Sequence, residues 1–157
     1  MKKHNKQALR HSSGQAGFTL IEILVVIGII AILAAVVIVA LNPARQFAQA
    51  RNSQRSSNVN TILNGINQRM IDNKGVWSST CGASTVTLPA STTNIGSGGG
   101  FVNLSPCLVP TYLVSIPFDP DGGTAASSGY HMWRDADDRL HVRAVKAELG
   151  ESVQVDR

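Results

Sequence analysis

Charge is missing from one long stretch near the N-terminus. From Ile23 to Leu41 there is no charged or strongly polar side chain, and 14 of these 19 residues are Ile, Leu or Val. Past Leu41 the sequence turns polar and is typical of a small soluble domain. The 157 residues suffice for one domain of ordinary size, but not for two large ones. The near-average content of hydrophobic residues therefore combines two different kinds of segment.

Acidic residues are absent from the first 17 positions, where four basic residues lie: Lys2, Lys3, Lys6 and Arg10. Without residues 1–17, 10 of the 14 basic residues remain against 10 acidic ones, so the rest of the chain is formally neutral. The high pI thus reflects this segment and does not argue for a nucleic-acid-binding surface. A basic segment before a membrane span keeps an N-terminus in the cytoplasm, so we expect the rest of the chain across the membrane.

The chain also lacks recognisable catalytic patterns. No Gly-x-Ser-x-Gly or comparable nucleophile setting occurs, and no carboxylate pair lies in a cleft-forming context. Gly98 to Gly100 form a glycine run, but no Lys follows it and no strand-to-helix context surrounds it, as a phosphate cradle requires. Residues 78–105, rich in Ser, Thr and Gly, predict a surface loop. The sequence therefore predicts neither an enzyme nor a cofactor.

Cysteine is scarce, and both cysteines, Cys81 and Cys107, lie in the part expected outside. An even count in an exported region predicts one disulfide, and two unpaired buried thiols are the alternative. Closing a loop of about 27 residues contributes roughly 3.5 kcal/mol in the chain-entropy model. Two cysteines at this spacing fit no metal-site pattern.

Three interpretations compete for residues 1–41. A secretory signal has an apolar region of 7–15 residues with a small-residue cleavage site after it, whereas here the apolar stretch is longer and Ala16-Gly17 precedes it. A plain membrane anchor suits the length, since residues 18–41 make about 36 Å of helix. It leaves Glu22 unexplained. The third interpretation is a prepilin signal, in which the leader is removed and the apolar segment is kept.

The third interpretation rests on a family resemblance. The residues that carry it are Gly17, Phe18, Thr19, Leu20, Ile21 and Glu22, followed by the apolar run from Ile23 to Ile27. This segment resembles the N-terminal motif of type IV pilins and type II secretion pseudopilins. The resemblance implies cleavage after Gly17 by a membrane-embedded prepilin peptidase, and N-methylation of the new N-terminus at Phe18.

Placing the Glu22 side chain in a membrane costs free energy. An ionisable side chain at the centre of a span costs on the order of 2.5–3.5 kcal/mol, which the branched apolar residues offset at roughly −0.3 to −0.6 kcal/mol each. Insertion gives no reason for an acid there, but a buried carboxylate is tolerable when it gains a partner. The resemblance implies that this partner is the free amino terminus of an adjacent subunit, here Phe18. The alternative is a glutamate that lies at the water interface.

Apolar residues at helical spacing resume after Asn42-Pro43. Pro43 either starts a helix or kinks a continuous one. This proline lies further from the N-terminus than in many type IV pilins. If unbroken, residues 18–73 form a helix of roughly 84 Å. An apolar stripe at helical spacing predicts that one side of residues 42–75 packs on a sheet, and Asn73-Lys74-Gly75 supplies a stop; the stripe is Val59, Ile62, Leu63, Ile66 and Met70.

Strand patterns follow in residues 76–157. Residues 112–116 predict a short strand, and residues 130–134 and 139–145 predict a hairpin around the turn 135–138. This order of elements matches pilins. We therefore predict an α+β, type IV pilin-like fold: a leader (1–17), an apolar helix (18–41), an amphipathic continuation (42–75), and a globular domain (76–157) with a small antiparallel sheet on which the helix packs.

Metal sites are weakly indicated. Major pseudopilins have a calcium site in sheet-side loops, which makes Asp119 and Asp121 candidates, with a second acidic cluster at 135, 137 and 138. Neither cluster has an EF-hand layout, and Asp is common in turns for backbone reasons. His131 and His141 suggest a metal pair, but a symmetric four-residue turn places residue 131 opposite 142 and turns the two imidazoles to opposite sides. His4 and His11 leave with the leader.

The sequence thus predicts a structural subunit of a type IV pilus-like filament. Its expected partners are identical or homologous subunits, the prepilin peptidase and N-methyltransferase, inner-membrane assembly machinery, and membrane lipid before assembly. We expect a single-pass precursor in the cytoplasmic membrane, and then an extracellular or periplasmic filament. The alternatives are a pseudopilin of a type II secretion or competence system, and a single-span membrane protein with an exported binding domain.

Overall fold

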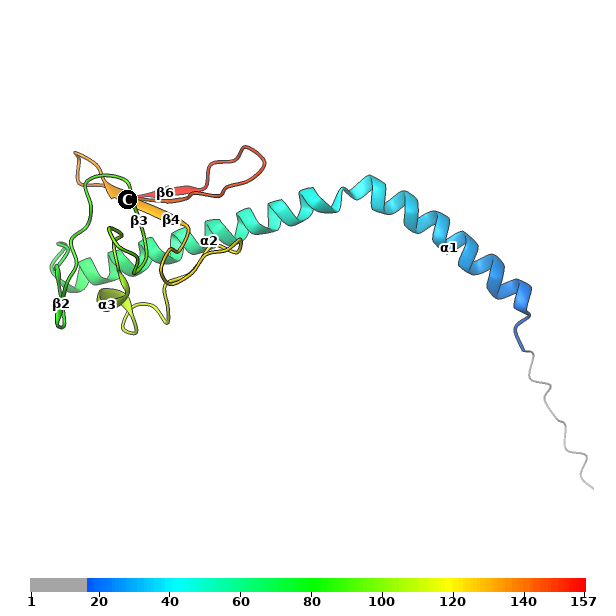
Figure 1. The fold of residues 1–157 in the computed structure, drawn as a ribbon, viewed down its shortest axis with the longest axis horizontal. Coiled ribbons are helices and arrows are strands. Elements are labelled where there is room, and N and C mark those ends of the chain that lie inside the picture. Colours follow the sequence, from blue (N-terminus) through cyan, green and yellow to red (C-terminus); the bar gives the residue numbers. More distant parts are fainter. Residues whose placement is uncertain (1–16) are drawn as a thin grey trace, which may run out of the picture. The chain divides into compact units, whose positions relative to one another are not determined.

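The computed structural model describes residues 17–157, and the predictions for the leader's basic residues and for His4 and His11 lie outside them. The chain divides into two compact units, and the boundary between them along the chain lies between Asn42 and Pro43. In chain order (Figure 1) the elements are α1 (Leu20–Leu41), α2 (Pro43–Asp72), β1 (Thr80–Cys81), β2 (Ser84–Thr85), β3 (Thr93–Asn94), α3 (Ser105–Leu108), β4 (Tyr130–Arg134), β5 (Leu140–Ala144) and β6 (Gln154–Asp156).

Helix α1 ends where proline follows. Asn42, its C-cap, adopts the left-handed conformation with φ of 42°, and α2 begins at Pro43. Proline is favoured at the first helical position because its missing N–H has no intrahelical acceptor there. Of the two predicted roles for Pro43, the structure therefore shows a helix start, and not one unbroken helix from 18 to 73.

The predicted apolar stripe of α2 is confirmed. Val59, Ile62, Leu63 and Ile66 are at most 1% exposed, and Met70 packs against them partly buried. At the end of the helix, the Gly75 N–H donates to the Met70 carbonyl (2.8 Å), with Gly75 at a φ of 86°. This left-handed residue stops α2 within the predicted Asn73-Lys74-Gly75 segment.

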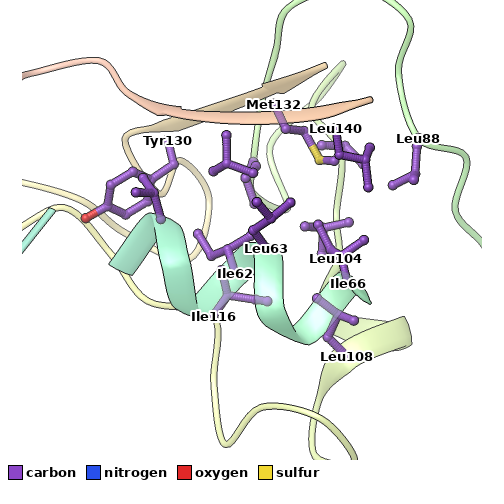
Figure 2. Packing of buried hydrophobic residues seen from close by; sticks show 14 of the residues in the cluster. Ile62, Leu63, Ile66, Leu88, Leu104, Leu108, Ile116, Tyr130, Met132 and Leu140 are labelled. Atoms are coloured by element: carbon purple, nitrogen blue, oxygen red, sulfur yellow. The ribbon is translucent and has the colours of Figure 1, made fainter. Parts of the chain in front are cut away.

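A four-stranded antiparallel sheet, in the order β3-β4-β5-β6, covers the apolar stripe of α2. Side chains alternate along its central strands, so one face is buried and the other faces outward. Figure 2 shows the buried face against α2, with loop residues closing the core around it; the buried side chains include Tyr130, Met132, Leu140, Leu88, Leu104, Leu108 and Ile116. The predicted α+β fold, with a long helix and a small antiparallel sheet, is confirmed.

The β4–β5 turn is one residue longer than the sequence suggests. Arg134 pairs with Leu140 and not with Arg139, because the Asp135 N–H donates to the Arg139 carbonyl (3.0 Å) to close a five-residue connection. The turn accommodates its extra residue because Asp138 adopts a φ of 68°, a conformation that Asp tolerates better than most residues. The hairpin prediction is confirmed, but its register is wrong by one residue.

The predicted strand at residues 112–116 is also wrong. The Tyr112 and Leu113 N–H groups both donate to the Leu108 carbonyl (2.8 and 3.0 Å), which closes a turn after α3. Leu113 packs onto Gly65 of α2, where an added Cβ would lie 2.9 Å from the leucine Cγ, and Val114 is 94% exposed. The apolar residues of this segment anchor a loop instead of forming one face of a strand.

A buried cation joins α2 to two loops. The Arg55 side chain is fully buried and donates to both carboxylate oxygens of Asp119 (2.8 and 3.1 Å), which is also fully buried. A third donor of Arg55 binds Glu148 (2.7 Å) and Asn52 (3.0 Å). Arg51 holds Glu148 through two more hydrogen bonds, of 2.7 and 2.6 Å. The bond to Asp119 raises the pKa of Arg55.

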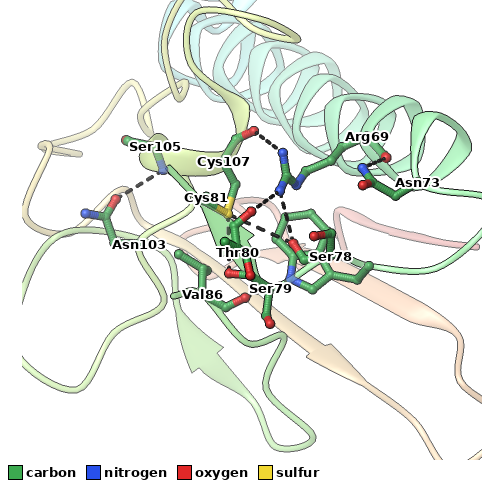
Figure 3. The surroundings of a disulfide bond; sticks show 11 residues. Arg69, Asn73, Ser78, Ser79, Thr80, Cys81, Val86, Asn103, Ser105 and Cys107 are labelled. Carbon is green, nitrogen blue, oxygen red and sulfur yellow. Dashed lines mark hydrogen bonds between the residues drawn. A yellow bond between two sulfur atoms is a disulfide. The ribbon is translucent and has the colours of Figure 1, made fainter. Parts of the chain in front are cut away.

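The loop after α2 is fastened twice. A disulfide joins Cys81 to Cys107. Beside it, the Arg69 guanidinium donates to the carbonyls of Cys107 (3.3 Å), Ser78 (3.1 Å) and Thr80 (2.8 Å), as Figure 3 shows. Arg69 thus binds both cysteine-bearing segments to the last turns of α2.

Replacing Asp119 with Asn should destabilise the domain by about 3–5 kcal/mol, because it leaves the Arg55 cation buried without its main counter-charge. Denaturant unfolding of the full chain in detergent, followed by tryptophan fluorescence, measures the loss. The exposed pair Arg134–Asp138 is the control, since Asp138→Asn should cost less than about 1 kcal/mol. The double variant Arg55→Met/Asp119→Leu should lose less than Asp119→Asn alone; a larger loss would contradict this account.

Acid should weaken the same network at Glu148. Hydrogen bonds from Arg51 and then Arg55 lower the pKa of Glu148 from 4.5 to about 2. Because the folded state binds this proton less tightly, its contribution to stability is complete above pH 4.5 and is lost as pH falls from there through about 2. Unfolding measured across this range should show a shallower acid decline in Glu148→Gln than in the parent chain. Equal slopes would contradict the assignment.

Candidate assembly helix and processing site

The predicted cleavage site lies just before α1, outside regular secondary structure. Gly17 and Phe18 are both exposed, and a Cβ built on Gly17 has no atom of the described residues within 4 Å, its chain neighbours aside. Thr19 caps the helix: its Oγ1 accepts a hydrogen bond from the Glu22 N–H (3.2 Å). The Gly17–Phe18 bond is therefore accessible, at a point where the backbone is not committed to helical hydrogen bonds.

Glu22 lies in the first turn of α1, where the unpaired N–H groups favour an acidic side chain. It is the only charged side chain of the helix. Cleavage before Phe18 would create an ammonium group four positions upstream, at the same end of the helix. An acid and a new cation would then lie at the same end of an otherwise apolar helix, where each requires a counter-charge.

Helix α1 presents apolar side chains on all sides. Its 22 residues span about 33 Å, which matches the hydrocarbon core of a bilayer, and by length and composition the helix is able to cross a membrane. None of its residues is buried within the described part of the chain. A surface of this size is stable only against lipid or against other apolar helices.

The acidic residues predicted for calcium have other partners. The Asp119 carboxylate is engaged by Arg55 and by the Asp121 N–H (2.8 Å), and Asp121 is paired with Lys146 (3.5 Å). In the second cluster, Asp135 binds His141. Among residues 17–157 no group of three or more His, Cys, Asp or Glu side chains is placed to hold a metal ion. Asp119 is thus a structural ion-pair residue, and calcium binding there stays a prediction.

The two sheet histidines share a face, contrary to prediction. Residue 131 pairs with Arg143, and His141 pairs with Trp133, so all four side chains point outward. The longer β4–β5 turn is the reason, because a one-residue change of register turns every side chain of a strand to the other face. Burial and then Arg143 lower the pKa of His131, whereas hydrogen bonds to carboxylates raise the pKa of His141. Both ring nitrogens of His141 face carboxylate oxygens, those of Asp135 and Asp156.

Comparison with known families bears on this N-terminal segment. Residues 12–38 match the family model described as the prokaryotic N-terminal methylation motif. The chain carries a type IV prepilin-like class III signal. The motif supports a protein of the type IV pilin or pseudopilin type, a structural class that is processed by a prepilin peptidase and assembles with other subunits. Comparisons with curated proteins and with solved structures gave no match.

Proposed function

We propose that this chain is a structural subunit of a type IV pilus-like filament, assembled through α1. The observation that carries the proposal is the overlap of the signal and the helix. The class III signal at residues 12–38 includes most of helix α1, which is apolar on all sides and holds a single acid, Glu22, in its first turn. A plain membrane anchor needs the apolar residues but not the acid.

The assembly mechanism follows from these residues. The precursor is held in the membrane by α1, and cleavage after Gly17 followed by N-methylation leaves a charged amine at Phe18. Glu22 of one subunit then pairs with the amine of its neighbour, which sets the register, while apolar packing of residues 18–41 supplies the attraction. Before cleavage that amine does not exist, so processing and assembly are coupled through one ion pair.

Intact-mass analysis of the purified protein tests the processing step. We expect a mass lower by residues 1–17 and higher by one methyl group. Gly17→Val should abolish this change while leaving the fold intact, because within residues 17–157 no atom apart from the chain neighbours of Gly17 lies within 4 Å of the added carbon. Gly28→Ala is the matched control, since that site is equally open. A retained leader in the unaltered chain would favour the membrane-anchored binding protein instead.

Replacing Glu22 with Ala tests the register. The variant should insert and be cleaved normally, yet yield at least about tenfold fewer filaments, since a hydrogen bond between charged groups contributes ~1.5–3 kcal/mol at each interface. Filaments are counted by electron microscopy and by sedimentation of sheared fibres. Glu22→Gln separates charge from shape, and Leu20→Ala controls for loss of apolar surface in the same turn. Normal filament yield from Glu22→Ala would exclude the proposed role, and short periplasmic fibres in place of surface filaments would indicate a pseudopilin.

A further inference from the structure

One histidine on the outward face of the sheet is bound at both ring nitrogens. His141 Nε2 lies 2.9 Å from Asp135 Oδ2, and His141 Nδ1 lies 3.0 Å from Asp156 Oδ1. The three residues come from different segments: the β4–β5 turn, strand β5 and the C-terminal strand β6. The ring is mostly shielded, with 14% of the side chain exposed.

This arrangement requires a protonated ring. A neutral imidazole has one N–H donor and one lone pair, whereas the imidazolium ion has two donors. With a carboxylate oxygen about 3 Å from each nitrogen, the neutral ring would direct its lone pair at an anion. Only the cation satisfies both contacts, and each is then a hydrogen bond between opposite charges.

Neighbouring groups hold the ring in place. The Trp133 indole from β4 stacks on it, with ring centroids 4.8 Å apart and planes within 7° of parallel. Arg143 lies over the same indole at 5.6 Å. Apart from His141 itself, the charged group that acts on the Asp156 carboxylate is Arg139 of the β4–β5 turn. In the same hairpin, Arg134 is paired with Asp138 (3.0 Å). The ring therefore has two anions at its edges and an aromatic face below it.

The contact fastens an edge strand. β6 is three residues long and pairs with β5 alone, where residue 141 lies opposite Asp156. Just beyond, Leu140 and Arg157 exchange two backbone hydrogen bonds (2.6 and 2.9 Å). The His141–Asp156 contact adds to this ladder, to the packing of Val155 against the core and to the hydrogen bond from Arg157 to Asn64 of α2 (3.0 Å).

We propose that His141 is a proton-operated latch that locks the C-terminal strand β6 onto the sheet. When the proton leaves, the ring keeps one N–H and loses one of the two bonds. In the tautomer that loses the bond to Asp156, the lone pair repels this carboxylate, so β6 opens more often than with the protonated ring. Opening would uncover the backbone N–H and C=O groups of β5, which are then free to pair with another chain. It would also loosen Val153, which is buried in the core beside this strand.

The pH dependence has a definite sign. The bond to Asp135, and then the bond to Asp156, raise the pKa of His141. The bond from His141 lowers the pKa of Asp135, whereas the pKa of Asp156 is lowered first by a hydrogen bond from Gln154 and then by the bond from His141. A raised histidine pKa means that its contribution is complete below 6.5, the value of the unfolded chain, and is lost as pH rises through the folded value. The latch is therefore closed in mildly acidic medium and opens on the alkaline side.

Hydrogen exchange of the full, processed chain in detergent tests the latch. Protection of peptides covering residues 150–157 is measured by mass spectrometry from about pH 5 to about pH 10, after correction for intrinsic exchange. In the parent chain, protection should fall by about tenfold or more as pH rises, since a charge-assisted bond is lost. His141→Gln should give low protection with no such step. His131→Gln is the matched control: that residue lies on the same face, and the step should survive its replacement.

A second measurement keeps the proposal testable if His141→Gln does not fold. The ring resonances of His141 in the parent chain are titrated by NMR, assigned by comparison with His131→Gln. A midpoint above that of an unstructured histidine, together with the exchange step at the same pH, supports the latch. A midpoint at or below that of an unstructured histidine overturns it, as does an exchange step that persists unchanged in His141→Gln.

Discussion

A single buried guanidinium determines how the globular unit closes. Arg55 lies on the side of α2 that faces the loops, and its donors reach Asp119 in one loop and Glu148 in another, about 60 and 90 residues further along the chain. An ion in this position is stable only if every partner is in place, so α2 and both loops must dock together. The apolar stripe can tolerate small shifts, whereas this network tolerates one arrangement. The core supplies the attraction, and Arg55 specifies the geometry.

The two units differ in how far their apolar side chains are covered. In α1 the apolar side chains are all left uncovered within the described chain, which only lipid or other helices can satisfy. In the unit from Pro43 onward many apolar side chains are buried in one core, and the loop from 78 to 107 is fastened by a disulfide and by Arg69. In the proposed filament, assembly would rest on the N-terminal helix, whose apolar side chains are not buried within residues 17–157.

Periodicity made the long-range features of this chain predictable. The uncharged run, the stripe from Val59 to Ile66 and the alternation in the β4–β5 hairpin each repeat over several turns or residue pairs, so one exception does not obscure them. Local choices were not predictable in this way. The register depended on whether Asp138 would adopt a positive φ, and β6 has too few residues for a pattern. Arg55 occupies a position at helical spacing from Val59, which was the available signal for a buried cation, but its partners lie far away in sequence.

The spacing of anchors along α2 has a mechanical consequence. Its contacts with the rest of the unit begin near Asn52, pass through Arg55 and the apolar stripe, and end at Arg69 beside the disulfide. A pull directed along this helix would load these contacts simultaneously, in shear, instead of peeling them away one at a time. Polar anchors at both ends and an apolar middle would then share the tension. A subunit held through its N-terminal segment would therefore resist extraction of α2 more strongly than its modest core suggests.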